Sequence, residues 1–386
     1  MTEWTECKIS DIGMVVGGAT PSTKKSENYE NGTIAWITPK DLSAFSGRYI
    51  RRGERNITET GLKSCSTQLL PKNTVLFSSR APIGYVAIAA NEVCTNQGFK
   101  SIVPNANTDA LFLYYLLKHN KDKIEGMGSG TTFKEVSGNI MKNIVVFVPT
   151  DKKVQETIAS VLGTIDDKIE ENERINNNLE QQAQAIYQRM FIDNASSDWE
   201  EGTLSDIADI TMGQSPSGSS YNEDGNGTIF FQGRAEFGFR FPTVRLYTTE
   251  PKRMACTNDT LMSVRAPVGD LNVAHVDCCI GRGLAAIHSK NNHQSFVLYT
   301  MFSLKKQLDV FNGEGTVFGS INRISLNDMP LIIPSSDKLD EFEALVAPMD
   351  AAIRNNYDEI CRLEQLRDSL LPKLISGELD VSDIEL

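Results

Sequence analysis

Two stretches of the chain carry apolar residues in the three-and-four spacing of a coiled-coil helix. The first runs from Ile158 to Met190, and the second, from Phe342 to Leu374, repeats the pattern 184 positions later. An a/d stripe held over more than about four heptads predicts two long helices that pair with each other. The residues expected to pair are Ile158, Leu162, Ile165, Ile169, Leu179, Val346, Met349, Ile353, Leu363 and Leu370.

Polar residues interrupt this stripe at Asn172, Asn176 and Asn356. An asparagine at a seam position sets the register of a coiled coil at some cost in stability. The alternative is that each long helix packs only against its own globular domain. At 1.5 Å per residue, a helix of this length makes a rod of roughly 50 Å.

The rest of the chain reads as short strands separated by turns. Runs such as 73–78, 85–90 and 143–149 are rich in β-formers and are bounded by Gly, Pro, Asn and Asp. Helical patterning returns at 111–124 and again at 296–308. These stretches therefore predict mixed α/β domains.

The chain also contains an internal sequence repeat. WTECKISDI (4–12) returns 195 positions later as WEEGTLSDI (199–207), and SRAPIG (79–84) returns 185 positions later as VRAPVG (264–269). The change of spacing places a longer loop in the first copy, between Leu42 and Arg80.

We therefore expect an α+β protein with an internal pseudo-two-fold repeat, in which two mixed α/β domains are separated by two long helices. The short link between the first helix and the second domain predicts that the helices form an antiparallel coiled coil. The expected segments are a domain at 1–150, a helical spacer at 151–198, a second domain at 199–337, and a second helical spacer with a tail at 338–386.

Composition narrows the function classes. Seven scattered cysteines without a CxxC pair, and four histidines outside any HExxH spacing, argue against a disulfide framework or a metal site. The chain has no apolar run long enough for a membrane span, and its start resembles no secretion signal, which predicts a cytoplasmic protein. The net charge of −12 is concentrated in the helical segments. The first domain has a net charge of +4 and the second of −4, so the total does not exclude nucleic acid.

Exposed polar residues near the repeated motifs suggest binding, since no catalytic motif stands out. Arg80 and Arg265 occupy the same place in the two RAP motifs, where an arginine can clamp phosphate or read guanine. The alternative is a buried arginine that satisfies backbone carbonyls at the corner. We interpret the cluster of Arg48, Arg51, Arg52 and Arg55 as a solvated loop. Further candidates for contacts to bases or phosphates are Lys40, Arg234, Gln232, Thr131, Thr132 and Lys134.

The chain resembles the specificity subunit of type I restriction-modification enzymes. The resemblance is carried by the repeated start motif, the RAPIG corner, GTTFKEVSGNIMKNIVVFVP leading into IASVLGTIDDKIE, and the tail LLPKLISGELDVSD. It implies two target-recognition domains, each reading half of a split, asymmetric site in double-stranded DNA. It also implies helical spacers that hold two methyltransferase (modification) subunits, which restriction subunits join. The chain would be no enzyme and would bind no cofactor, because S-adenosylmethionine belongs to the methyltransferase subunit.

One junction departs from the family pattern. VPTDKKVQE and IPSSDKLDE stand where members usually have a Glu-Gln pair before the helix. Three other interpretations stay open: a coiled-coil scaffold with two protein- or carbohydrate-binding domains, a stand-alone methyltransferase or nuclease, and a recognition module of a related type II or phage-defence system. Salt-dependent DNA binding would test the first alternative and binding of S-adenosylmethionine the second, whereas the third differs only in its partner and would be decided by the neighbouring genes.

Overall fold

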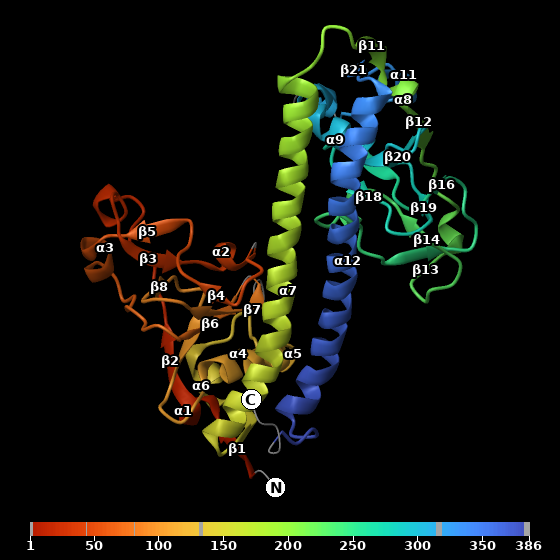
Figure 1. Cartoon of the computed structure of the whole chain (residues 1–386). Helices are drawn as coiled ribbons and strands as arrows, with labels where there is room; N and C mark the ends of the chain where they lie inside the picture. Colours follow the sequence, from red (N-terminus) through yellow and green to blue (C-terminus); the bar gives the residue numbers. More distant parts are fainter. Residues whose placement is uncertain (1–2, 44, 81, 131–133, 314–318, 382–386) are drawn as a thin grey trace. The chain divides into compact units, whose positions relative to one another are not determined.

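The computed structural model describes residues 3–43, 45–80, 82–130, 134–313 and 319–381. The chain forms two compact units: unit 1 comprises residues 1–171 and 359–386, and unit 2 comprises residues 172–358. Each long helix therefore contributes one part to each unit (Figure 1). Among the described residues, no helix combines the length and apolar character that crossing a membrane requires.

The first repeat alternates short strands with short helices and ends in a long helix. Its elements are β1 (Trp4–Lys8), α1 (Ile9–Ile12), β2 (Gly13–Gly17), η1 (Ser26–Asn28), β3 (Ile34–Ile37), α2 (Pro39–Ser43), β4 (Tyr49–Ile50), β5 (Arg55–Ile57), α3 (Glu59–Lys63), β6 (Val75–Ser79), β7 (Ile83–Ala89), β8 (Cys94–Thr95), β9 (Lys100–Pro104), α4 (Ala110–His119), α5 (Lys121–Gly126), α6 (Gly138–Asn143), β10 (Val145–Pro149) and α7 (Lys152–Tyr187), followed by the π-helical η2 (Gln188–Asp193).

The second repeat follows nearly the same order. Its elements are β11 (Glu200–Thr203), α8 (Leu204–Ile207), β12 (Ala208–Met212), η3 (Gly218–Ser220), β13 (Tyr221–Asn222), β14 (Thr228–Phe231), η4 (Arg234–Glu236), β15 (Leu246–Thr248), β16 (Met254–Ala255), β17 (Thr260–Ser263), β18 (Leu271–Val273), β19 (Cys278–Ile280), β20 (Leu284–Ser289), α9 (Gln294–Ser303), α10 (Lys305–Leu308), η5 (Asp309–Asn312), α11 (Arg323–Asn327), β21 (Pro330–Ile333) and α12 (Ser336–Ile375).

The sheets of the two repeats share a common core of strands, to which β4 is added in unit 1 and β13 and β16 are added in unit 2. The order β2-β9-β6-β7 in unit 1 corresponds to β12-β20-β17-β18 in unit 2. In a second sheet, β3 lies between antiparallel β5 and parallel β8, as β14 lies between antiparallel β15 and parallel β19. A two-stranded ladder, β1 with β10 or β11 with β21, joins the start of each repeat to the strand before its long helix. The internal repeat predicted from the motifs is confirmed.

The long helices run antiparallel within each unit. In unit 1, Arg367 Nη1 of α12 donates to Asp166 Oδ1 of α7 at 2.9 Å. In unit 2, Asn356 Nδ2 donates to Asn176 Oδ1 at 2.8 Å, so two of the predicted seam asparagines bond each other. The mixed α/β fold with an antiparallel coiled coil is confirmed. Of the residues expected to pair, Ile158, Leu162, Ile169, Val346 and Ile353 are buried, and Ile165, Leu179, Met349, Leu363 and Leu370 are half-buried.

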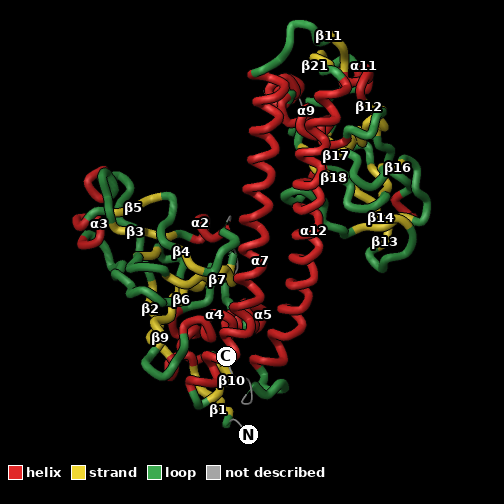
Figure 2. The backbone as a smooth tube through the Cα atoms, in the orientation of Figure 1, coloured by secondary structure: helices red, strands yellow, loops and turns green. Residues whose placement is uncertain are grey.

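The helices also pack against the domains, so the two packing alternatives occur together. In unit 1, α4 lies between the strands and α7 (Figure 2). Its Phe112 and Leu116 share one core with Ile158 and Leu162 of α7. In unit 2, Phe296 of α9 shares a core with Phe342 of α12. Each domain is therefore continuous with the helices through its hydrophobic core.

Candidate nucleic-acid interface

Each RAP motif forms a corner that is braced by a serine. In unit 1, Ser78 Oγ donates to Pro82 O at 2.8 Å and accepts from Tyr85 N at 2.8 Å. In unit 2, Ser263 Oγ donates to Pro267 O at 2.7 Å and accepts from Asp270 N at 2.9 Å. The corner then turns at Gly84 (φ +98°) and Gly269 (φ +82°), a backbone region that glycine adopts without strain. The motif recurs because the same turn is built twice.

Two other segments meet at each corner. In unit 1, Ser79 N donates to Gly98 O at 2.7 Å, and Val136 N donates to Ser79 O at 2.9 Å. In unit 2, Val264 N donates to Gly283 O at 2.9 Å, and Ile321 N donates to Val264 O at 3.1 Å. We call these sites corner 1 (residues 79–80, 82–84, 96–100 and 134–136) and corner 2 (residues 264–270, 281–283 and 319–321, with the neighbouring Gln232, Arg234 and Lys305). The two corners share one backbone framework and carry different side chains.

The arginines of the RAP motifs are accessible. The Arg80 side chain is 36% exposed, and its Nη1 lies 3.9 Å from Glu135 Oε2, too far for a strong ion pair. Arg265 is exposed beside Ser320, with which it forms an isolated β-bridge. The alternative of a buried arginine that satisfies carbonyls is therefore wrong for both positions. Each guanidinium can reach a ligand from solvent.

Corner 1 gathers further positive charge. Lys134 is exposed, and Lys100 Nζ lies 3.3 Å from Glu135 Oε1. Arg80 and Lys100 thus flank the Glu135 carboxylate, and Lys134 adds an exposed positive charge beside it in the chain. Thr131 and Thr132, also predicted to contact phosphate, lie outside the described residues.

In corner 2, the Asp270 carboxylate lies within ion-pair distance of two cationic side chains. Arg234 Nε lies 2.7 Å from Asp270 Oδ2, and Lys305 Nζ lies 3.2 Å from Asp270 Oδ1. The predicted Gln232 is exposed, and its backbone lies close to the 281–283 loop: a Cβ on Gly281 would meet Gln232 O at 2.8 Å. The structure thus gathers Arg234, Arg265 and Gln232 around one corner.

The structure places two other predicted features elsewhere. Lys40 lies on α2, where its Nζ is 2.8 Å from Glu54 Oε2; this hydrogen bond raises the pKa of Lys40 and lowers the pKa of Glu54. The solvated-loop interpretation holds for Arg51 and Arg52, which are exposed, whereas Arg55 is exposed but begins strand β5. It is wrong for Arg48, whose side chain is 5% exposed and ion-paired. The loop turns this one arginine inward, onto carboxylates of α7.

Sequence reasoning missed Gln97 and Arg282, which are exposed at matched positions of the two corners. Gln97 accepts a hydrogen bond from Thr20, and Arg282 N donates to Ser215 Oγ at 3.3 Å. Their signal was the 185-residue spacing itself, which aligns Asn96-Gln97-Gly98 with Gly281-Arg282-Gly283. No sequence motif marked Lys100 or Lys305 as a candidate.

The corners can therefore bind an extended anion through arginine, lysine and amide donors, the groups that contact phosphates and base edges. Among the residues that the structure describes, no cluster of three His, Cys, Asp or Glu side chains could hold a metal ion.

Known proteins share this architecture over nearly the whole chain. The family described as type I restriction modification DNA specificity domain matches residues 1–181 and 196–345. The type I restriction enzyme MjaIX specificity subunit of Methanocaldococcus jannaschii is 34% identical over 99% of this chain and 95% of its own length. A second relative from that organism, the putative MjaX specificity subunit, is 29% identical over 80% of this chain and 78% of its own. The crystal structure of a type I restriction-modification S subunit from M. genitalium has the same fold, with a TM-score of 0.64 and 17% identity over 97% of this chain and 96% of that chain. The chain therefore belongs to the family of type I restriction-modification specificity subunits, in which its role is DNA recognition rather than catalysis.

Proposed function

We propose that each domain reads one half of a split, asymmetric site in double-stranded DNA through its corner. The observation that carries the proposal is the pair of corners, which share a backbone framework and differ in side chains. Corner 1 presents Gln97 and Lys134, whereas corner 2 presents Arg282 and Arg234. Shared groups suit phosphates, which are the same at every step, and different groups suit different bases. Two unlike half-sites are the expected result.

Partners complete this function. The long helices dock two methyltransferase (modification) subunits, and restriction subunits join the assembly. S-adenosylmethionine is held by the methyltransferase subunits. With net charges of +4 and −4 on 1–150 and 199–337, the two domains bind DNA weakly by themselves, and the partner subunits supply much of the phosphate contact.

A domain exchange tests the two-reader proposal. Residues 1–150 are replaced by the corresponding domain of a relative with a known site, and the chimera is co-expressed with the methyltransferase subunit. Sequencing of methylated bases should show one half of the motif changed and the other half unaltered. The matched control exchanges residues 199–337 and should alter the opposite half. A change in both halves from a single exchange would contradict the proposal.

A further inference from the structure

One buried arginine stands at the same place in each repeat. The backbone carbonyl of Arg48 accepts a hydrogen bond from Ile88 N of β7, and that of Arg240 accepts one from Val273 N of β18, both at 2.8 Å. Ile88 and Val273 have the same 185-residue spacing as the two RAP motifs. The side chains of Arg48 and Arg240 are 5% and 4% exposed. The two arginines are therefore structural counterparts, although no sequence motif surrounds them.

In unit 1, Arg48 is bound along one face of α7. Its Nε lies 3.0 Å from Glu170 Oε1, its Nη2 is paired with Asp167, and its Nη1 donates to Gly163 O at 3.2 Å. Gly163 permits this approach, because a Cβ there would lie 3.1 Å from the Leu111 side chain and 3.3 Å from Arg48 Nη1. One guanidinium thus contacts two successive turns of the helix.

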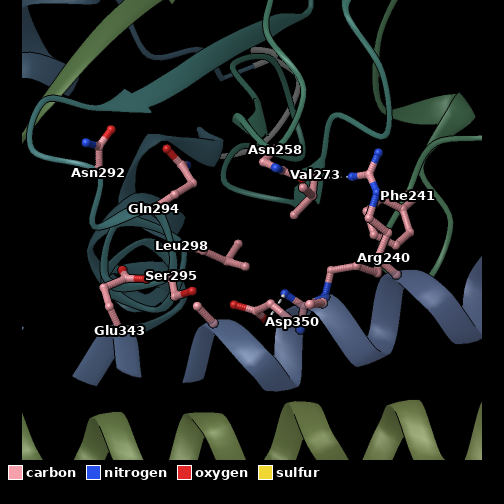
Figure 3. Close-up of a pocket in the computed structure, with 13 residues that line it drawn as sticks. Arg240, Phe241, Asn258, Val273, Asn292, Gln294, Ser295, Leu298, Glu343 and Asp350 are labelled. Carbon is pink, nitrogen blue, oxygen red and sulfur yellow. Dashed lines mark hydrogen bonds and ion pairs between the residues drawn. The ribbon is translucent and has the colours of Figure 1, made fainter. Parts of the chain in front are cut away.

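In unit 2, Arg240 contacts both long helices. Its Nη2 lies 3.0 Å from Glu180 Oε2 of α7, and its Nη1 lies 3.3 Å from Asp350 Oδ1 of α12. Figure 3 shows the Arg240 guanidinium facing the Asp350 carboxylate along the wall of a pocket. Burial raises the pKa of Asp350 and of Glu180, and the charge of Arg240 opposes that shift.

A matched tyrosine from each domain also binds an aspartate of the long helices. Tyr115 OH of α4 donates to Asp166 Oδ2 at 2.6 Å, and Tyr299 OH of α9 donates to Asp350 Oδ1 at 2.9 Å. Both the tyrosines and the aspartates are spaced by 184 residues. Each domain is therefore tied to the long helices by a tyrosine from its own helix and an arginine beside its main sheet.

We propose that Arg48 and Arg240 are positioning residues that set how each domain is oriented on the long helices, and thereby which gap between the two half-sites is accepted. Apolar packing at the base of each domain is non-directional and tolerates small rotations. A guanidinium whose backbone is hydrogen-bonded to a strand and whose donors meet fixed oxygens on a helix has far less freedom. The inference rests on the proposed function, because it assumes that each domain reads a half-site.

Arg48→Met is the sharpest test. Methionine keeps much of the buried stem, and the carboxylates left behind are accessible to water, since the side chains of Asp167 and Glu170 are 71% and 40% exposed. The full chain, assembled with the methyltransferase subunit, is given duplexes whose half-sites are separated by the natural gap or by one base pair more or fewer. The variant should lose about tenfold of the preference for the natural gap while its preference for each half-site sequence is unchanged.

Two further variants separate positioning from folding. Arg51→Met, at an exposed arginine of the same loop, should keep the gap preference of the wild type. Glu170→Gln removes one partner charge and should relax the gap preference in the same direction, even where Arg48→Met fails to fold. Unchanged gap preference in the folded variants, with a split site still methylated, would overturn the inference alone. If the wild-type assembly methylates no split site, the proposed function itself fails.

Discussion

At the scale of single residues, the arginines of this chain differ in what surrounds them rather than in type. Arg48 and Arg51 are three positions apart, yet one side chain is buried among carboxylates of α7 and the other is exposed. Arg80 and Arg265 lie at equivalent corners and remain accessible. If the two corners face different half-sites, as we propose, identical residues there suit a task that both share, and phosphate contact is such a task.

Arg80→Ala therefore tests a phosphate contact. Because the side chain is partly exposed and its nearest carboxylate oxygen is 3.9 Å away, the free energy of unfolding should change by less than about 0.5 kcal/mol. DNA affinity should fall by a similar factor on all sequences, and the slope of log affinity against log salt should become smaller by about one. Salt titrations of the assembled complex measure this, and Arg265→Ala should behave alike. Loss of preference for a single half-site would show base reading instead.

At the scale of elements, the apolar stripe of α7 and that of α12 each pack against two partners, the other long helix and the domain cores. One edge of the stripe forms the antiparallel pair, where Asn176 and Asn356 bond each other, and the other packs into the domain cores. Asp166 and Asp350, next to the stripe, are bound by Tyr115 and Tyr299 of the domains. The two helices therefore pair with each other as a coiled coil and also form part of the hydrophobic core of each domain.

Ile353→Asp tests this double role. The side chain is fully buried, so a carboxylate there would be desolvated without a partner and should cost about 4 kcal/mol of stability. Urea unfolding of the full chain, together with copurification of the methyltransferase subunit, should show both losses. The control Leu345→Asp replaces a residue of the same helix that is 48% exposed and should change stability by less than about 0.5 kcal/mol. Equal stability of the two variants would count against the buried seam.

At the scale of the whole molecule, the two repeated domains, which we propose to be the two DNA readers, are joined by continuous helices. Since α7 and α12 each pass from one unit into the other, we expect their length to contribute to the spacing of the half-sites. In this proposal helix length sets the coarse spacing of the half-sites, whereas Arg48 and Arg240 set the fine orientation of each domain.

Removing one heptad from each helix, around Asn172 in α7 and around Asn356 in α12, tests the coarse spacing. Seven residues correspond to about 10.5 Å of helix, close to three base pairs of duplex. The methylated motif should keep both half-sites and shorten its gap by about three base pairs, or recognition should be lost. Sequencing of methylated bases measures the gap. A functional deletion variant with the original gap would contradict the role of helix length.

The sequence by itself was sufficient for the architecture. Spaced motifs revealed the duplication, and apolar periodicity revealed the two long helices, because both signals are local in the chain or exact in their spacing. It also brought Arg80, Arg265, Arg234 and Gln232 forward as candidates, and the structure places them at the two corners.

Only the tertiary structure decided which polar residues face solvent and which face the helices. The burial of Arg48 depends on Gly163, Asp167 and Glu170, more than a hundred positions away. Gln97 joins Arg80 at one corner through a backbone bond between Ser79 and Gly98. The sequence alone does not distinguish a charged side chain that is exposed to water from one that pairs with a carboxylate in a buried position. The surroundings of such a side chain come from distant segments, which are brought together only when the chain folds.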